Sequence, residues 1–122
     1  MVQKRVLAII GLGHVGAHVA YALAIQGIAD ELVLVDQNEQ KLASEVQDLR
    51  DAVAYLPHRV TVRAGGFADL GACDVIVNSV GKIELLRGTH DRVTEMDFTI
   101  PAVRGYAEKI KASGFDGVLI NI

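Results

Sequence analysis

The stretch IIGLGHVGAHVA, residues 9–20, places three glycines within six positions, between an apolar run and an alanine-rich helical pattern. Glycine weakens strands and helices, so its concentration here indicates a turn that another group approaches closely. Residues 5–10 are apolar and β-branched, which predicts a strand before the turn. Residues 15–26 have a helical pattern that Gly27 is expected to end. The stretch therefore predicts a strand, a glycine turn and a helix in direct succession.

Further short apolar runs follow, and helical patterns separate most of them. Because Pro101 interrupts the last helical pattern, we expect either two helical pieces, the second capped by Thr99, or one kinked helix. Short strands that alternate with helices predict a parallel sheet with right-handed crossovers, and thus a Rossmann-type doubly wound α/β fold with three αβα layers in one domain, 1–122. The expected strands are 32–35, 60–63, 74–79 and 117–122, and the expected helical segments are 41–54, 67–72 and 92–111.

Composition excludes several classes of protein. The net charge is −3 and the pI is about 5.7, which gives no basic surface for nucleic acid. Cys73 is the only cysteine, so no internal disulfide can form, and no cysteine or histidine cluster has metal-ligand spacing. The apolar run before Gly11 is too short for a membrane span or a signal peptide. We therefore expect a cytoplasmic protein that binds no metal, nucleic acid or membrane.

The glycine turn has the spacing Gly-x-Gly-x-x-Gly, formed by Gly11, Gly13 and Gly16. Between a strand and a helix, this spacing is typical of dinucleotide sites: the three glycines permit a tight turn, approach of a pyrophosphate and close helix packing. Asp36 ends the second predicted strand, about twenty residues further on, where a carboxylate can bind ribose hydroxyls. It would repel a 2′-phosphate, which favours NAD over NADP. The alternative is a simple turn and a polar strand end.

The segment GKIELLRGTHDR, residues 81–92, begins at the end of the fourth predicted strand. Loops of this length are often lids over a site, and Arg92 at its end could polarise a carbonyl or bind a carboxylate. His90 lies in the segment without an evident partner, so we do not expect it to be a catalytic base. The alternative is a surface loop whose arginines face water.

The sequence resembles the L-lactate and malate dehydrogenase family, and within it the L-2-hydroxyisocaproate dehydrogenases. The motifs that carry the resemblance occur in family order: IIGLGHVGAHVA, LVLVDQNEQK, DVIVNSVG, GTHDRVTEMDFT and SGFDGVLINI. The resemblance implies the NAD-binding half of an enzyme that interconverts 2-oxo and L-2-hydroxy acids by hydride transfer. It also implies that the catalytic histidine belongs to a C-terminal domain absent from this chain, that the chain alone is inactive, and that the parent protein is a dimer or tetramer.

The resemblance also implies roles for individual residues. Arg92 corresponds to the catalytic arginine that polarises the substrate carbonyl, and Leu85 and Leu86, which would bind substrate with it, imply an aliphatic 2-oxo acid. A shift of one or two positions would place Arg87 there instead and imply a malate dehydrogenase. A stand-alone NAD-sensing regulatory module is the alternative of another class, although it needs no segment like 81–92. The implied cofactor-binding residues are Gly11, Leu12, Gly13, His14, Val15, Gly16, Asp36, Lys41, Val80 and Gly81.

Overall fold

The structure is a computed structural model that describes residues 2–82, 88 and 91–122. Its strands are β1 (Val6–Ile10), β2 (Glu31–Val35), β3 (Thr61–Ala64), β4 (Val75–Asn78) and β5 (Val118–Asn121). Its helices are α1 (His14–Gln26), α2 (Glu39–Val53) and α3 (Arg92–Ala112), with a short 3₁₀ helix η1 (Phe67–Ala72) between β3 and β4.

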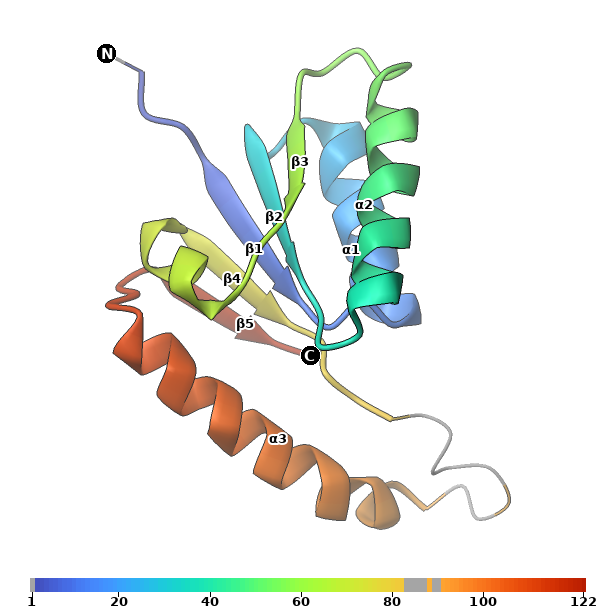
Figure 1. Cartoon of the computed structure of the whole chain (residues 1–122), viewed down its shortest axis with the longest axis vertical. Coiled ribbons are helices and arrows are strands. Elements are labelled where there is room, and N and C mark those ends of the chain that lie inside the picture. The colour runs from blue at the N-terminus through green and yellow to red at the C-terminus, as the bar shows by residue number, and fades with distance from the viewer. Residues whose placement is uncertain (1, 83–87, 89–90) are drawn as a thin grey trace.

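The strands form one five-stranded sheet in the order β3-β2-β1-β4-β5, and every neighbouring pair is parallel. Helices α1 and α2 cover one face of the sheet, and η1 and α3 cover the other (Figure 1). The order reverses at β1, because the chain builds outward to β3 and then returns to place β4 on the other side of β1. This topology confirms the predicted doubly wound α/β fold, and its reversal point is where such sheets bind ligands.

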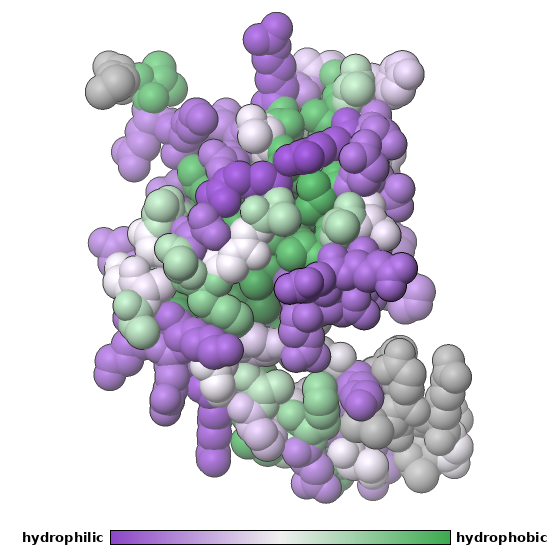
Figure 2. Space-filling model, viewed as in Figure 1, coloured by the Kyte–Doolittle hydropathy of each residue, from purple (hydrophilic) through white to green (hydrophobic). Residues whose placement is uncertain are grey.

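The central strand shows how the sequence builds the two layers of core. Leu7 and Ile9 point toward α1 and α2, whereas Ala8 and Ile10 point toward η1 and α3, as the alternation of side chains in a strand requires. Continuous apolar strands are needed because both faces of a parallel sheet are covered. In the view of Figure 2, polar side chains cover most of the surface, and apolar ones are visible between them over the sheet.

The end of α1 agrees with the sequence prediction. Gly27 has a φ of 63°, and its amide donates a hydrogen bond to the carbonyl of Ala24. A residue with a Cβ would be strained in this left-handed conformation, and its Cβ would lie 2.4 Å from the ring of His58. Glycine is therefore required here both to end the helix and to admit the histidine.

Two forms were predicted for the last helical segment, either two pieces or one kinked helix, and the structure excludes the first. Helix α3 is continuous from Arg92 to Ala112 with Pro101 inside it, so the expectation of two pieces is wrong. Thr99 does not cap a second piece, because its hydroxyl donates to the carbonyl of Glu95 within the same helix. The cap is Asp91, whose carboxylate accepts from the amide of Val93 at 2.9 Å. Proline removes a single hydrogen-bond donor, and the turns on both sides of Pro101 continue the helix to Ile110, its buried residue.

Candidate functional site

The glycine turn lies between β1 and α1, at the carboxyl edge of the sheet. Gly11 has a φ of +87°, and a Cβ there would lie 3.1 Å from the main chain of Ser79 and Val80. A Cβ at Gly16 would lie 1.9 Å from the carbonyl oxygen of Gly11. Neither position can hold a larger residue without moving the backbone. The protein's own packing therefore explains the first and third glycines of the motif.

Gly13 is different, because nothing in the described protein lies within 4 Å of the place where its Cβ would be. Its φ of −69° is also open to other residues, so neither backbone strain nor an internal neighbour requires glycine. Gly13 is the N-cap of α1, it provides no side-chain cap, and no acidic residue lies in the first turn of the helix. The exposed amides of a helix N-terminus attract anions. Gly13 thus leaves open the approach to a place suited to phosphate.

Asp36 follows β2 and joins two loops through its carboxylate. Oδ2 accepts from the amide of Leu12 at 2.8 Å, and Oδ1 accepts from the amide of Asn38 at 2.8 Å. The side chain of Asn38 in turn accepts from the amide of Lys41 and caps α2. Each carboxylate oxygen has a second lone pair, so the group can also accept from ribose hydroxyls.

A cavity of about 460 Å³ lies beside Asp36, between the loop after β2 and one side of α3. Gly105 contributes no side chain to it, and Tyr106 forms part of the wall. Burial raises the pKa of the Tyr106 hydroxyl, and the negative charge of Asp36 raises it further. The pocket is large enough for a planar ring system. The residues that line it are Gln37, Asp97, Phe98, Pro101, Ala102, Gly105, Tyr106 and Lys109.

Sequence reasoning missed this pocket and also missed Ser79. The Ser79 hydroxyl donates to the carbonyl of Gly11 at 2.8 Å and thereby fastens the glycine turn to the end of β4. The available signals were weak: Ala102 and Gly105 are small residues spaced three apart on a helix, and a serine ends an apolar strand. Neither pattern is distinctive without the neighbouring elements.

The remaining predicted residues lie at several places along the same edge. Leu12 is buried and only its amide faces Asp36, whereas His14 and Val15 are exposed in the first turn of α1. Lys41 is exposed in the first turn of α2, and Val80 and Gly81 follow β4. Arg92 begins α3 with an exposed side chain. Four residues singled out in the sequence fall outside the described part of the chain: Leu85, Leu86, Arg87 and His90.

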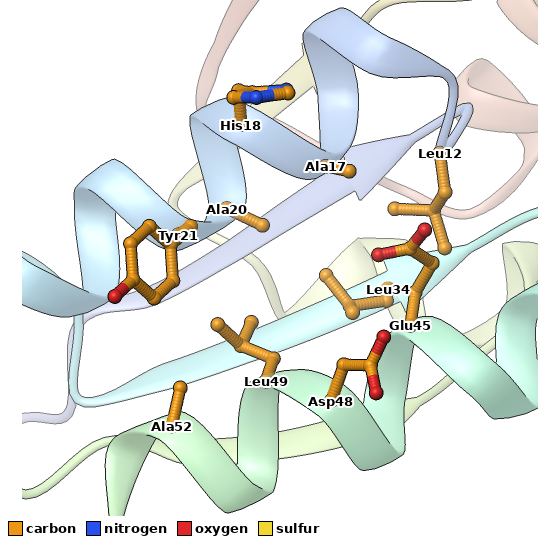
Figure 3. A pocket seen from close by; sticks show the side chains of 10 residues that line it. All are labelled: Leu12, Ala17, His18, Ala20, Tyr21, Leu34, Glu45, Asp48, Leu49 and Ala52. Atoms are coloured by element: carbon orange, nitrogen blue, oxygen red, sulfur yellow. The ribbon is translucent and has the colours of Figure 1, made fainter. Parts of the chain in front are cut away.

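A second cavity, of about 260 Å³, opens between α1 and α2 on the opposite face of the sheet (Figure 3). Ala17 and Ala20 of α1 line one side of it, and Leu49 of α2 lines the other. Glu45 and Asp48 supply carboxylates at its border. An apolar hollow with acidic groups suits neither a diphosphate nor a dinucleotide, so we assign the candidate site to the edge that carries the glycine turn.

Within the described ranges 2–82, 88 and 91–122, no group of three histidine, cysteine or acidic side chains is arranged to hold a metal ion. No helix within the same ranges has the length and apolar character needed to cross a membrane.

The glycine turn, Asp36 and the pocket beside α3 meet at the reversal point of the sheet, which is the arrangement of a dinucleotide-binding Rossmann domain. The family model described as "lactate/malate dehydrogenase, NAD binding domain" matches residues 5–121, and the chain belongs to this family. NAD is accordingly the cofactor of this domain, as the sequence predicts.

Individual relatives agree with the family match. The L-lactate dehydrogenase of Fusobacterium nucleatum is 36% identical over 122 residues, which are 100% of this chain and 37% of that protein. L-lactate dehydrogenase 1 of Bifidobacterium longum is 34% identical over 98% of this chain and 37% of its own length. The chain thus spans little more than a third of the curated relatives it matches.

Solved structures give the same result for the fold. The ligand-bound minor L-lactate dehydrogenase of Enterococcus mundtii superposes with a TM-score of 0.88 at 30% identity, over 97% of this chain and 37% of that one. A lactate dehydrogenase from a Medee basin deep-sea metagenome library has a TM-score of 0.86 at 27% identity, over 98% and 38% of the two chains.

Proposed function

We propose that this chain is the NAD-binding part of an L-2-hydroxyacid dehydrogenase that reduces a 2-oxo acid to an L-2-hydroxy acid, and catalyses the reverse reaction. The observation that carries the proposal is the open space at Gly13. The fold itself requires Gly11 and Gly16, but the second glycine has no internal reason, and a ligand that approaches the α1 N-terminus supplies one.

The geometry supports one orientation of the dinucleotide. The amides after Gly13, beside His14 and Val15, would hold the pyrophosphate, and Asp36 would accept from the adenosine ribose. The pocket between Gln37 and α3 would receive the adenine ring, with Lys41 at the same end. Val80 and Gly81, after β4, would line the nicotinamide side. This orientation follows the carboxyl edge of the sheet from β2 across β1 to β4.

The chemistry is divided between the cofactor and the protein. NAD supplies the hydride-carrying ring, while this chain binds and orients that ring and brings the positive charge of Arg92 to the substrate. A guanidinium can donate hydrogen bonds to the carbonyl oxygen on which negative charge develops. Hydride transfer also requires a proton donor at that oxygen, which we assign to a second domain of a longer, cytoplasmic and homo-oligomeric protein.

The binding proposal is tested by titrating the chain with NADH and NADPH and following the fluorescence of the reduced nicotinamide. We expect NADH to bind about tenfold or more tightly than NADPH, because Asp36 repels a 2′-phosphate. Gly13→Val is expected to weaken NADH binding by at least about tenfold, since its side chain fills the open approach. Gly66→Val is the matched control, because Gly66 is also an N-cap with no atom near its Cβ position. Equal effects of the two variants would contradict the proposal.

The substrate class is a separate prediction for the longer protein. Leu85 and Leu86 favour aliphatic 2-oxo acids, so we expect kcat/KM for pyruvate or 2-oxoisocaproate to exceed that for oxaloacetate by about tenfold or more. The reverse preference would support the malate-type alternative, in which Arg87 pairs with the second carboxylate. Tight NADH binding without turnover of any 2-oxo acid would favour the stand-alone sensor.

A further inference from the structure

Glu95 lies in the first turn of α3, and its carboxylate joins the two ends of the segment between β4 and α3. Oε1 accepts from the amide of Lys82 at 3.0 Å, and Oε2 pairs with Nη1 of Arg92 at 3.1 Å. The Glu95 side chain is only 14% exposed, whereas that of Arg92 is 78% exposed. The carboxylate is therefore the fixed member of the pair, and the guanidinium is the member that reaches into solvent.

The surroundings of Glu95 show why the carboxylate is fixed. A Cβ at Gly81 would lie 3.0 Å from Oε1, so the absence of a side chain there leaves room for the carboxylate. The ammonium group of Lys82 lies 5.1 Å from the centre of the Phe98 ring, one turn further along α3. A glutamate near the start of a helix is also stabilised by the helix dipole. The space at Gly81, the contact of Lys82 with the Phe98 ring and the start of α3 thus together fix the position of the Glu95 carboxylate.

We propose that Glu95 is a positioning residue: it anchors the guanidinium of Arg92 to the main chain at Lys82 and so sets the direction in which Arg92 presents its charge. The inference rests on the proposed function, in which Arg92 polarises the substrate carbonyl. A guanidinium has five N–H donors in a planar fork, so a bond through Nη1 leaves the Nε and Nη2 edge for a substrate oxygen.

The anchoring also has a physical rationale in entropy. An exposed arginine samples many rotamers, and each conformer that points away from the substrate reduces catalysis. An exposed ion pair contributes little stability because ordering two long side chains costs entropy. Here one partner is already ordered by the amide of Lys82, so only Arg92 loses freedom. We therefore expect Glu95 to influence turnover far more than it influences the stability of the fold.

The decisive experiment is a double-mutant cycle in the longer protein, with NADH and a 2-oxo acid. Glu95→Gln keeps the size and an acceptor oxygen but removes the charge that holds Arg92. We expect kcat to fall about tenfold in Glu95→Gln and about 10²–10³-fold in Arg92→Gln, with no further loss in the double variant. Glu108→Gln, an exposed carboxylate near the other end of α3, is the matched control and should retain wild-type kcat.

Additive losses in the cycle, or equal kcat values for Glu95→Gln and wild type, would overturn the inference. NADH affinity is expected to stay within about twofold in both single variants, since neither residue contacts the dinucleotide in the proposed orientation. A wild-type protein that turns over no 2-oxo acid would instead refute the proposed function.

A second measurement needs only the 122-residue chain and no activity. In ¹H–¹⁵N spectra, Glu95→Ala should shift the Lys82 amide and the Arg92 Nε–H signals, whereas Glu108→Ala should leave both in place. Glu95→Gln should move the Arg92 signal more than the Lys82 signal, because the amide keeps an acceptor. Thermal unfolding of each variant verifies that the chain is folded. Unchanged Arg92 and Lys82 signals in folded Glu95→Ala would disprove the anchoring, whatever the protein's activity.

Discussion

Asp36 shows that one side chain can shape a site as well as bind its ligand. Its two carboxylate oxygens accept hydrogen bonds from two different loops: from the amide of Leu12 in the glycine turn and from the amide of Asn38 before α2. A residue that only contacted ribose would leave the unliganded turn unaffected. The observed hydrogen bonds instead make the carboxylate part of the turn. Its removal should therefore lower the stability of the fold even when no nucleotide is bound.

The corresponding prediction concerns stability without ligand. Asp36→Ala leaves the part-buried amide of Leu12 and the exposed amide of Asn38 without their acceptor, and we expect it to lower the free energy of unfolding by about 1–2 kcal/mol. Urea unfolding of the chain measures this, with the exposed Asp116→Ala as control. Asp36→Asn keeps an acceptor oxygen and should lose less stability, but it should narrow the difference in affinity between NADH and NADPH. Wild-type stability of Asp36→Ala would show that the two hydrogen bonds do not shape the turn.

The elements that sequence alone predicted well are those with local signals. The strand, glycine turn and first helix depend on residues within a few positions of one another, and Gly27 ends α1 by its own backbone conformation. The alternation of strands and helices also predicted a parallel, doubly wound sheet, whereas the particular order β3-β2-β1-β4-β5 is a result of the structure. The local order of residues sufficed for these features because their signals lie within a few positions of one another.

Other features depend on contacts that sequence patterns do not encode. Helix α3 continues through Pro101, with Asp91 capping its start and Ile110 buried near its end, so the proline alone did not indicate where the helix stops. The role of Ser79 depends on a partner 68 positions away at Gly11. The pocket beside Asp36 exists only where α3 crosses the loop after β2. Contacts between residues that are far apart in sequence can be identified only in the folded chain.

At the scale of the whole molecule, β5 is the least covered part of the sheet. It pairs with β4 on one side and forms one edge of the sheet (Figure 1), and all four of its residues are exposed. Leu119 and Ile120 are each 47% exposed, although neighbouring residues of β4 are buried. Exposed apolar edge strands pair readily with other chains, and natural proteins usually cover or charge them.

This exposure predicts how the 122-residue chain behaves in isolation. We expect the wild-type chain to self-associate with rising concentration, and the double variant Leu119→Thr/Ile120→Thr to remain monomeric, because threonine keeps β propensity while removing apolar surface. Sedimentation velocity over a concentration series measures the difference. Tyr55→Thr is the control, since Tyr55 is 93% exposed but lies just after α2, far from β5 in sequence. If the wild-type chain is monomeric throughout, the apolar side chains of β5 do not drive association. If Tyr55→Thr suppresses association as strongly as the β5 variant, the contact surface lies elsewhere.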